Sequence, residues 1–189
     1  MARRKTNKKT VLLTAGAIVV LLGIHMITAW YLNRFYGNET YVCMGSEKLF
    51  HFHPEQNTAG SFLNLKFQIG YSKVIFILLS AMCVLFFVWL LRYFLRLKEF
   101  YGMGAWVAMS PVFFISAILG RIAERLLWEY TFDFIAVRNV GILDVGDVYL
   151  FVGCAVLIVT AVYMQTRENS MMRGMSREEK KAFKKKIRW

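Results

Sequence analysis

Residues 74–95 read VIFILLSAMCVLFFVWLLRYFL, a run that is apolar almost throughout. A helix needs roughly 20 consecutive apolar residues to cross the hydrocarbon core of a bilayer. A strand of a transmembrane barrel would alternate apolar and polar residues, and this run does not alternate. The stretch therefore predicts a transmembrane helix, because a helix of this length satisfies its own backbone hydrogen bonds in lipid.

Three further apolar runs lie on either side of it, at residues 11–31, 103–128 and 148–164. Hydrophobic residues make up 57% of the chain, above the roughly 45–50% of an ordinary soluble domain. The first run follows a basic start, as a signal peptide would, but no small-residue cleavage site comes after it. We therefore predict an all-α membrane protein with four transmembrane helices, the first of them uncleaved.

The net charge of +12 is concentrated near the two ends of the chain. Of the 24 Lys and Arg residues, 17 lie in residues 1–10, in residues 92–98 or beyond residue 164. Cytoplasmic segments beside membrane spans carry such an excess, and they attract anionic lipids. We therefore predict a cytoplasmic basic N-tail (1–10), a membrane domain (11–164) and a cytoplasmic basic C-tail (165–189). Membrane lipids are the expected partners, and nucleic acid is not.

Two segments then face the outside, residues 36–73 and residues 129–146. The first is too long for a tight turn, and it alternates in part, as in residues 62–69, FLNLKFQI. Alternation of this kind is typical of a half-buried strand. We therefore predict a small extracytoplasmic β-rich loop between the first and second helices.

Acidic residues of two neighbouring spans come to the same depth. The third span runs outward, so Glu124 lies at the outer face, and Asp147 opens the fourth span at that face. Two carboxyls held close in a partly desolvated site do not both ionise easily, so one can activate water while the other protonates the leaving nitrogen. The spacing also fits structural roles. Glu124 could pair with an arginine of its own helix, and Asp144 and Asp147 could cap the next helix.

The residues around these acids resemble the C-terminal motifs of the lipoprotein signal peptidases (signal peptidase II). Residues 120–125, GRIAER, are similar to the family's Gly-Asn-x-x-Asp-Arg, and Asp133 follows Glu124 by nine residues, as in the family's Val-Asp-Phe. Residues 143–147, LDVGD, are similar to Phe-Asn-x-Ala-Asp. Residues 56–62, QNTAGSF, resemble the family's Asn-x-Gly-Ala-Ala-Phe segment.

The resemblance implies a membrane aspartic endopeptidase that cleaves the signal peptides of prolipoproteins at the outer face of the bacterial cytoplasmic membrane, with no metal or cofactor. Its partner would be a membrane-anchored prolipoprotein. By motif position the resemblance implies Glu124 and Asp147 as the catalytic pair. The supporting or substrate-binding residues that it implies are Asn57, Gly60, Arg121, Arg125, Asp133 and Asp144.

The chain departs from the family at several motif positions. Glu124 stands where the family has its first Asp, and one added methylene can displace a catalytic group by about 1 Å. Arg121 and Asp144 replace the two motif asparagines. The alternative hypothesis is therefore a catalytically impaired pseudopeptidase that binds lipid-anchored or transmembrane peptides.

The histidines have other interpretations. His25 lies inside the first span, where we expect a hydrogen-bonded packing histidine in preference to a proton relay. A polar path across the bilayer would need more ionisable groups than this one, which argues against a transporter. His51 and His53 would share one face of a strand, but only Glu55 lies near them as a third metal ligand. We therefore predict no metal site.

Overall fold

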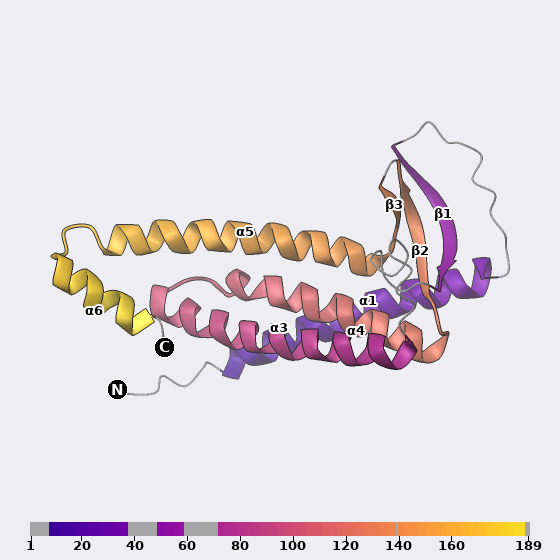
Figure 1. Ribbon diagram of the computed structural model, residues 1–189, viewed down its shortest axis with the longest axis horizontal. Coiled ribbons are helices and arrows are strands. Elements are labelled where there is room, and N and C mark those ends of the chain that lie inside the picture. The colour runs from indigo at the N-terminus through magenta and orange to yellow at the C-terminus, as the bar shows by residue number, and fades with distance from the viewer. Residues whose placement is uncertain (1–7, 38–48, 59–71, 139, 188–189) are drawn as a thin grey trace.

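The computed structural model describes residues 8–37, 49–58, 72–138 and 140–187. Four long helices run side by side and form the body of the molecule (Figure 1). They are α1 (Lys8–Tyr36), α3 (Lys73–Tyr101), α4 (Met109–Leu127) and α5 (Val145–Met171). A short 3-10 helix, η1 (Ala105–Ala108), leads into α4, and a last helix, α6 (Arg177–Ile187), follows α5.

Four helices among the described residues are long and apolar enough to cross a membrane. The predicted fold class, an all-α membrane protein with four transmembrane helices, is therefore confirmed. The helices extend beyond the apolar runs, because the polar residues at their ends continue the same backbone hydrogen bonding. For example, α3 continues to Tyr101 and ends where Gly102 adopts the left-handed conformation (φ 65°), which glycine adopts without strain.

Helix α4 lies at the centre of the bundle and contacts α1, α3 and α5. In the most apolar part of α4, 56% of the residues are buried inside the protein. In the most apolar part of α3 none are, so these apolar side chains are available to contact lipid. Small residues such as Ser110, Ser116 and Gly120 are buried on α4 and let its neighbours approach closely. The Ser110 hydroxyl also donates to the Gly153 carbonyl of α5, at 2.9 Å. This close packing fixes the ends of α4 and α5 next to each other.

A three-stranded antiparallel sheet in the order β1–β2–β3 stands at one end of the bundle (Figure 1). Strand β1 (Phe50–Asn57) comes from the segment where a β-rich loop was predicted. Its partners β2 (Thr131–Val137) and β3 (Gly141–Leu143) come from the second outer segment. The sequence of β2, TFDFIAV, does not alternate because the central strand is largely buried along its length. The alternating residues 62–69 lie outside the described part of the chain.

The register of β1 against β2 brings two predicted site residues together. Asn57 pairs with Thr131 and Glu55 pairs with Asp133, after an irregularity between Phe52 and Glu55. This irregularity includes Pro54, which has no N–H to donate to a ladder. The end of β1 thereby places Asn57 beside Asp133, near the C-terminal end of α4 and the start of α5.

Candidate functional site

The C-terminal end of α4 and the start of α5 bring a cation and two acids into direct contact. Arg121 of α4 binds Asp144 with two parallel bonds, Nε to Oδ2 at 3.0 Å and Nη2 to Oδ1 at 2.9 Å. The same Nη2 lies 2.6 Å from Oδ1 of Asp147. Two-pronged binding of a carboxylate by arginine is among the strongest hydrogen-bonded arrangements in proteins. One guanidinium therefore faces two carboxylates.

Asp144 and Asp147 also form the start of α5. Asp144 is the N-cap residue, its side chain accepts from the backbone N–H of Asp147, and its own N–H donates to Asp147 Oδ2 at 3.3 Å. The capping role that the spacing allowed is therefore present. Asp144 is fully buried, whereas the Asp147 side chain keeps 24% of its surface exposed. Of the two acids, Asp147 is the one that water can reach.

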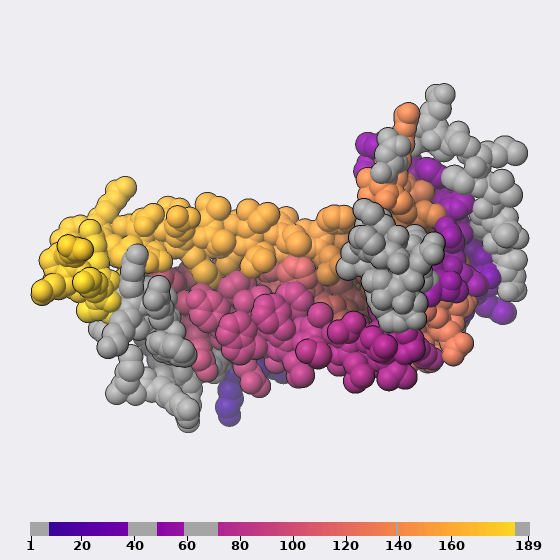
Figure 2. All heavy atoms as spheres, in the orientation of Figure 1, coloured from indigo at the N-terminus to yellow at the C-terminus, as the bar shows by residue number. Residues whose placement is uncertain are grey.

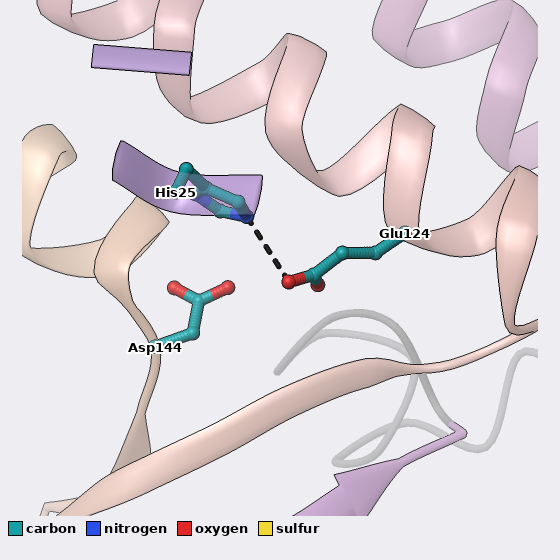
Figure 3. A group of neighbouring side chains, drawn as sticks. All are labelled: His25, Glu124 and Asp144. Atoms are coloured by element: carbon teal, nitrogen blue, oxygen red, sulfur yellow. Dashed lines mark hydrogen bonds and ion pairs between the residues drawn. The ribbon is translucent and has the colours of Figure 1, made fainter. Parts of the chain in front are cut away.

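Glu124 does not pair with the arginines of its own helix, within the part of the chain that the structure describes. Its Oε1 lies 3.2 Å from Nε2 of His25, which reaches across from α1 (Figure 3). Both side chains are nearly inaccessible, at 1% for His25 and 2% for Glu124. His25 Nδ1 and Glu124 Oε2 have no hydrogen-bond partner among the described residues. Glu124 is thus held inside the bundle by His25.

Two glycines make room for the His25 ring. A Cβ atom at Gly120 would lie 2.6 Å from Cδ2 of His25, and one at Gly146 would lie 3.3 Å from its Cε1. We expected His25 to be a hydrogen-bonded packing histidine, and it is buried at 1% exposure with Glu124 as its hydrogen-bond partner. The sequence contains no local signal for this contact, because the face of α1 that packs inward is set by tertiary structure; in the structure His25, Ala29 and Leu32 form a buried stripe of α1.

His25, Glu124 and Asp144 are also the one group in the described part of the chain with the geometry of a metal site. Their ligand atoms all lie within 4.8 Å of one another (Figure 3). One imidazole and two carboxylates are donors that zinc accepts. Arg121, however, already neutralises Asp144, and a cation here would lie beside its guanidinium. We therefore interpret the group as a network of charges and protons.

Asp133 of β2 lies in the same region, and its charge state differs from that of Asp144. Asn57 Nδ2 donates to Asp133 Oδ2 at 2.8 Å. Burial, and after it the negative charges of Asp144 and Asp147, raise the pKa of Asp133 to about 7. Burial also opposes ionisation of Asp144, but the Arg121 guanidinium holds the pKa of that carboxyl below its usual range. Near neutral pH, Asp133 can therefore carry a proton while Asp144 is ionised.

Arg125 links the sheet to the helix bundle through hydrogen bonds. Its Nη1 donates to the Glu129 carbonyl and its Nη2 to the Thr58 carbonyl, both at 2.7 Å. Its guanidinium also lies 5.4 Å from the ring centre of Phe76 in the first turn of α3. Arg125 thus ties the end of β1 to α3 and α4. Gly60, the remaining predicted site residue, lies outside the described residues.

The family model described as signal peptidase (SPase) II matches residues 6–163. The chain belongs to the signal peptidase II family. Two solved structures, each described as a bacterial membrane enzyme studied by the in meso method, share the fold. One has a TM-score of 0.61 and 13% identity over 79% of this chain and 92% of its own. The other has a TM-score of 0.58 and 14% identity over 80% and 88%. No curated protein matches the chain.

Membership of the signal peptidase II family confirms the resemblance seen in the motifs. It identifies a multi-pass bacterial membrane protein of an aspartic protease family that processes lipoproteins. All the acids described above lie inside the matched residues. The end of α5 and the whole of α6 lie beyond residue 163, outside the part that the family shares.

Proposed function

We propose that this signal peptidase II family member is an active endopeptidase whose catalytic pair is Asp133 and Asp147. The observation that carries the proposal is a charge balance. Two carboxyls, those of Asp144 and Asp147, contact the single guanidinium of Arg121, and the charges of these three groups act on the nearby Asp133. Asp144 takes the two-pronged bond. Asp147 also binds the guanidinium, so Asp133, with its pKa raised to about 7, is the acid that keeps a proton near neutral pH. One protonated and one ionised acid is the state that an aspartic pair requires.

This pair differs from the one implied by motif position, Glu124 and Asp147. A catalytic acid must reach both a water molecule and the peptide. Glu124 is 1% exposed and lies against His25, whereas Asp133 is 7% exposed, lies on the sheet and accepts a hydrogen bond from Asn57. We therefore assign Glu124 and His25 a positioning role behind the catalytic pair.

The chemistry follows from the two protonation states. Asp147, the ionised member, takes a proton from water, and the water oxygen attacks the scissile carbonyl carbon. Asp133 gives its proton to the carbonyl oxygen, so a neutral gem-diol forms. Asp147 then returns its proton to the leaving nitrogen as the C–N bond breaks, and one diol hydroxyl returns a proton to Asp133. Both acids end as they began, and one water molecule is consumed.

The substrate would enter at the outer face of the cytoplasmic membrane. The sheet and the acids lie at one end of the helices, and α1 begins and α6 ends at the other (Figure 1). The excess of Lys and Arg is at the α1 and α6 end, which supports a cytoplasmic location for both termini. A membrane-anchored prolipoprotein would then present its cleavage site to the sheet, at the depth where a signal peptide leaves the bilayer.

A cleavage assay with a lipid-modified prolipoprotein peptide tests the proposal. We expect Asp133→Asn and Asp147→Asn each to lower kcat by about 10²–10⁴-fold, the usual contribution of a positioned acid or base. Glu124→Gln should cost roughly tenfold, because it weakens one charged hydrogen bond. Glu129→Gln, an exposed acid paired with Lys73, is the matched control and should cleave normally. If Asp133→Asn cleaves the peptide and Glu124→Gln does not, our assignment is wrong and the catalytic pair is Glu124 and Asp147, as motif position implies.

The second candidate is the pseudopeptidase, and the observation that favours it is the capture of Glu124 by His25. In that case the wild-type protein binds the lipid-modified peptide but releases no cut product. Because the binding and cleavage measurements use the same peptide, one experiment separates the two functions. A cut product that Asp147→Asn abolishes would eliminate the pseudopeptidase.

A further inference from the structure

The chain beyond the family match folds back on the bundle. After α5 ends, Gly174 adopts a left-handed backbone (φ 82°) that lets the chain reverse. Ser176 and Glu179 then fix the start of α6. The Ser176 N–H donates to Glu179 Oε2 at 2.7 Å, and the Glu179 N–H donates to Ser176 Oγ at 3.2 Å. Phe183 of α6 packs on Phe100 of α3, with ring centres 5.7 Å apart. Helix α6 is therefore a docked element.

This turn encloses a basic cleft between the end of α5 and α6. Its volume is about 410 Å³, within the range of small-molecule sites. Four cations and no acid line it. Its lining residues are Asn169, Met172, Arg173, Arg177, Lys180 and Lys181. Arg177, Lys180 and Lys181 lie at spacings of three and four residues, so they share one face of α6.

Glu168 and Glu179 lie near the cleft in the sequence, but neither lines it. Glu179 accepts the Ser176 N–H, and this bond lowers the pKa of its carboxyl, so that it stays ionised at the helix start. The cations of the cleft are thus not neutralised by these two carboxylates, and the cleft attracts an anion.

The depth of the cleft identifies the anion. Trp106 of η1 and Tyr163 of α5 stack edge to face, with ring centres 5.5 Å apart, and both are exposed. Such aromatic pairs gather at the boundary between hydrocarbon and headgroups. Asn169 follows Tyr163 by six residues, or about 9 Å along a helix. The basic cleft therefore lies at the level of lipid phosphates, at the end of the molecule opposite the sheet (Figure 2).

We propose that the basic cleft between α5 and α6 binds the headgroup of an anionic phospholipid. The phosphate would lie among Arg173, Arg177 and Lys180, with the acyl chains running along the exposed apolar side of α5. Such a site differs from the diffuse attraction of any basic tail, because it depends on how α6 is docked as well as on its charge. The inference is independent of the proposed peptidase activity.

Native mass spectrometry of the full chain in neutral detergent tests the site, with phosphatidylglycerol and phosphatidylcholine as probes. We expect retention of phosphatidylglycerol over phosphatidylcholine. Arg173→Gln/Arg177→Gln/Lys180→Gln/Lys181→Gln should lower retention by at least about tenfold. The matched control, Arg3→Gln/Arg4→Gln/Lys5→Gln/Lys8→Gln, removes the same charge from the other tail and should retain the lipid.

Phe183→Ala separates the docked cleft from charge alone, because it keeps every cation and removes the contact with Phe100. We expect it to lose most of the selective retention while the chain keeps its helicity. Equal losses in the cleft variant and the control would overturn the proposal, as would full retention by Phe183→Ala. Displacement of the lipid by inorganic phosphate at the same concentration would assign the cleft to the free anion instead. None of these readouts requires the protein to cleave a peptide.

Discussion

Arg121→Asn, Asp144→Asn and the double variant test the ion pair between Arg121 and Asp144. We expect the two single substitutions to lower the stability of the fold by different amounts. Arg121→Asn leaves Asp144 and Asp147 buried or half-buried without their shared cation. Loss of one partner of a buried pair costs about 3–5 kcal/mol. Asp144→Asn leaves the guanidinium with Asp147 as its remaining partner, and asparagine still caps a helix, so we expect about 1–3 kcal/mol. The arginine variant should therefore be the less stable of the two.

The double variant shows whether Arg121 and Asp144 contribute to the free energy of unfolding as a coupled pair or independently. Arg121→Asn/Asp144→Asn removes both charges and restores the asparagines of the family motif. We expect it to lie within about 1–2 kcal/mol of the wild type, which is well short of the sum of the single effects.

Thermal unfolding in detergent provides the measurement. For a chain of this length about 1 kcal/mol shifts Tm by 2–4 °C, so Arg121→Asn should lower Tm by roughly 6–20 °C. The pair Lys73 and Glu129 is the matched control, because its side chains are 38% and 80% exposed. Its coupling should stay below about 1 kcal/mol. Additive losses at Arg121 and Asp144 would refute the reasoning, because they would show that the two charges do not depend on each other.

Three further predictions concern the neighbouring residues. The pKa of Asp133 in the folded protein is raised to about 7. Its contribution to stability is therefore complete below the ordinary pKa of about 4 and is lost as the pH rises to about 7, a decline of up to ~4 kcal/mol. Asp133→Asn should flatten this decline, which measurements of Tm at a series of pH values would show. Gly120→Ala should destabilise the fold by about 1–3 kcal/mol, because its Cβ would lie 2.6 Å from the His25 ring. Gly16→Ala, with nothing within 4 Å, should be neutral or stabilising in the same melts. His25→Ala should lower Tm more than His25→Gln, which can still donate to Glu124, and equal losses would argue against that bond.

The apolar runs were enough to predict the bundle, because a membrane span depends on length and composition. The sheet was harder to predict from the sequence. Strand β1 lies in the predicted loop, but β2 and β3 come from residues whose apolar pattern has no period of two. Strand pairing between segments about 80 residues apart, such as Asn57 with Thr131, depends on tertiary packing that a local pattern does not contain.

The acids at the sheet end of the bundle were found from the sequence, but their partners were not. The spacing placed Glu124 and Asp147 at one depth, and it allowed Asp144 to cap α5, as it does. It did not show that Arg121 turns toward Asp144, or that His25 comes from another helix to hold Glu124. Depth along a helix follows from counting residues, whereas the direction of a side chain depends on which faces pack together.

The contacts of these partners explain the residues that depart from the family motif. Arg121 and Asp144 occupy the two asparagine positions and bind each other, so the added positive charge and the added acid neutralise one another. Glu124, the longer acid, binds His25, for which Gly120 leaves room. Each unusual residue therefore has a partner inside the bundle, and the proposed mechanism assigns the chemistry to Asp133 and Asp147. An unpaired buried charge destabilises the fold, so matched charges are expected in an active peptidase and in a pseudopeptidase alike, and the cleavage assay with Asp133→Asn and Asp147→Asn decides between them.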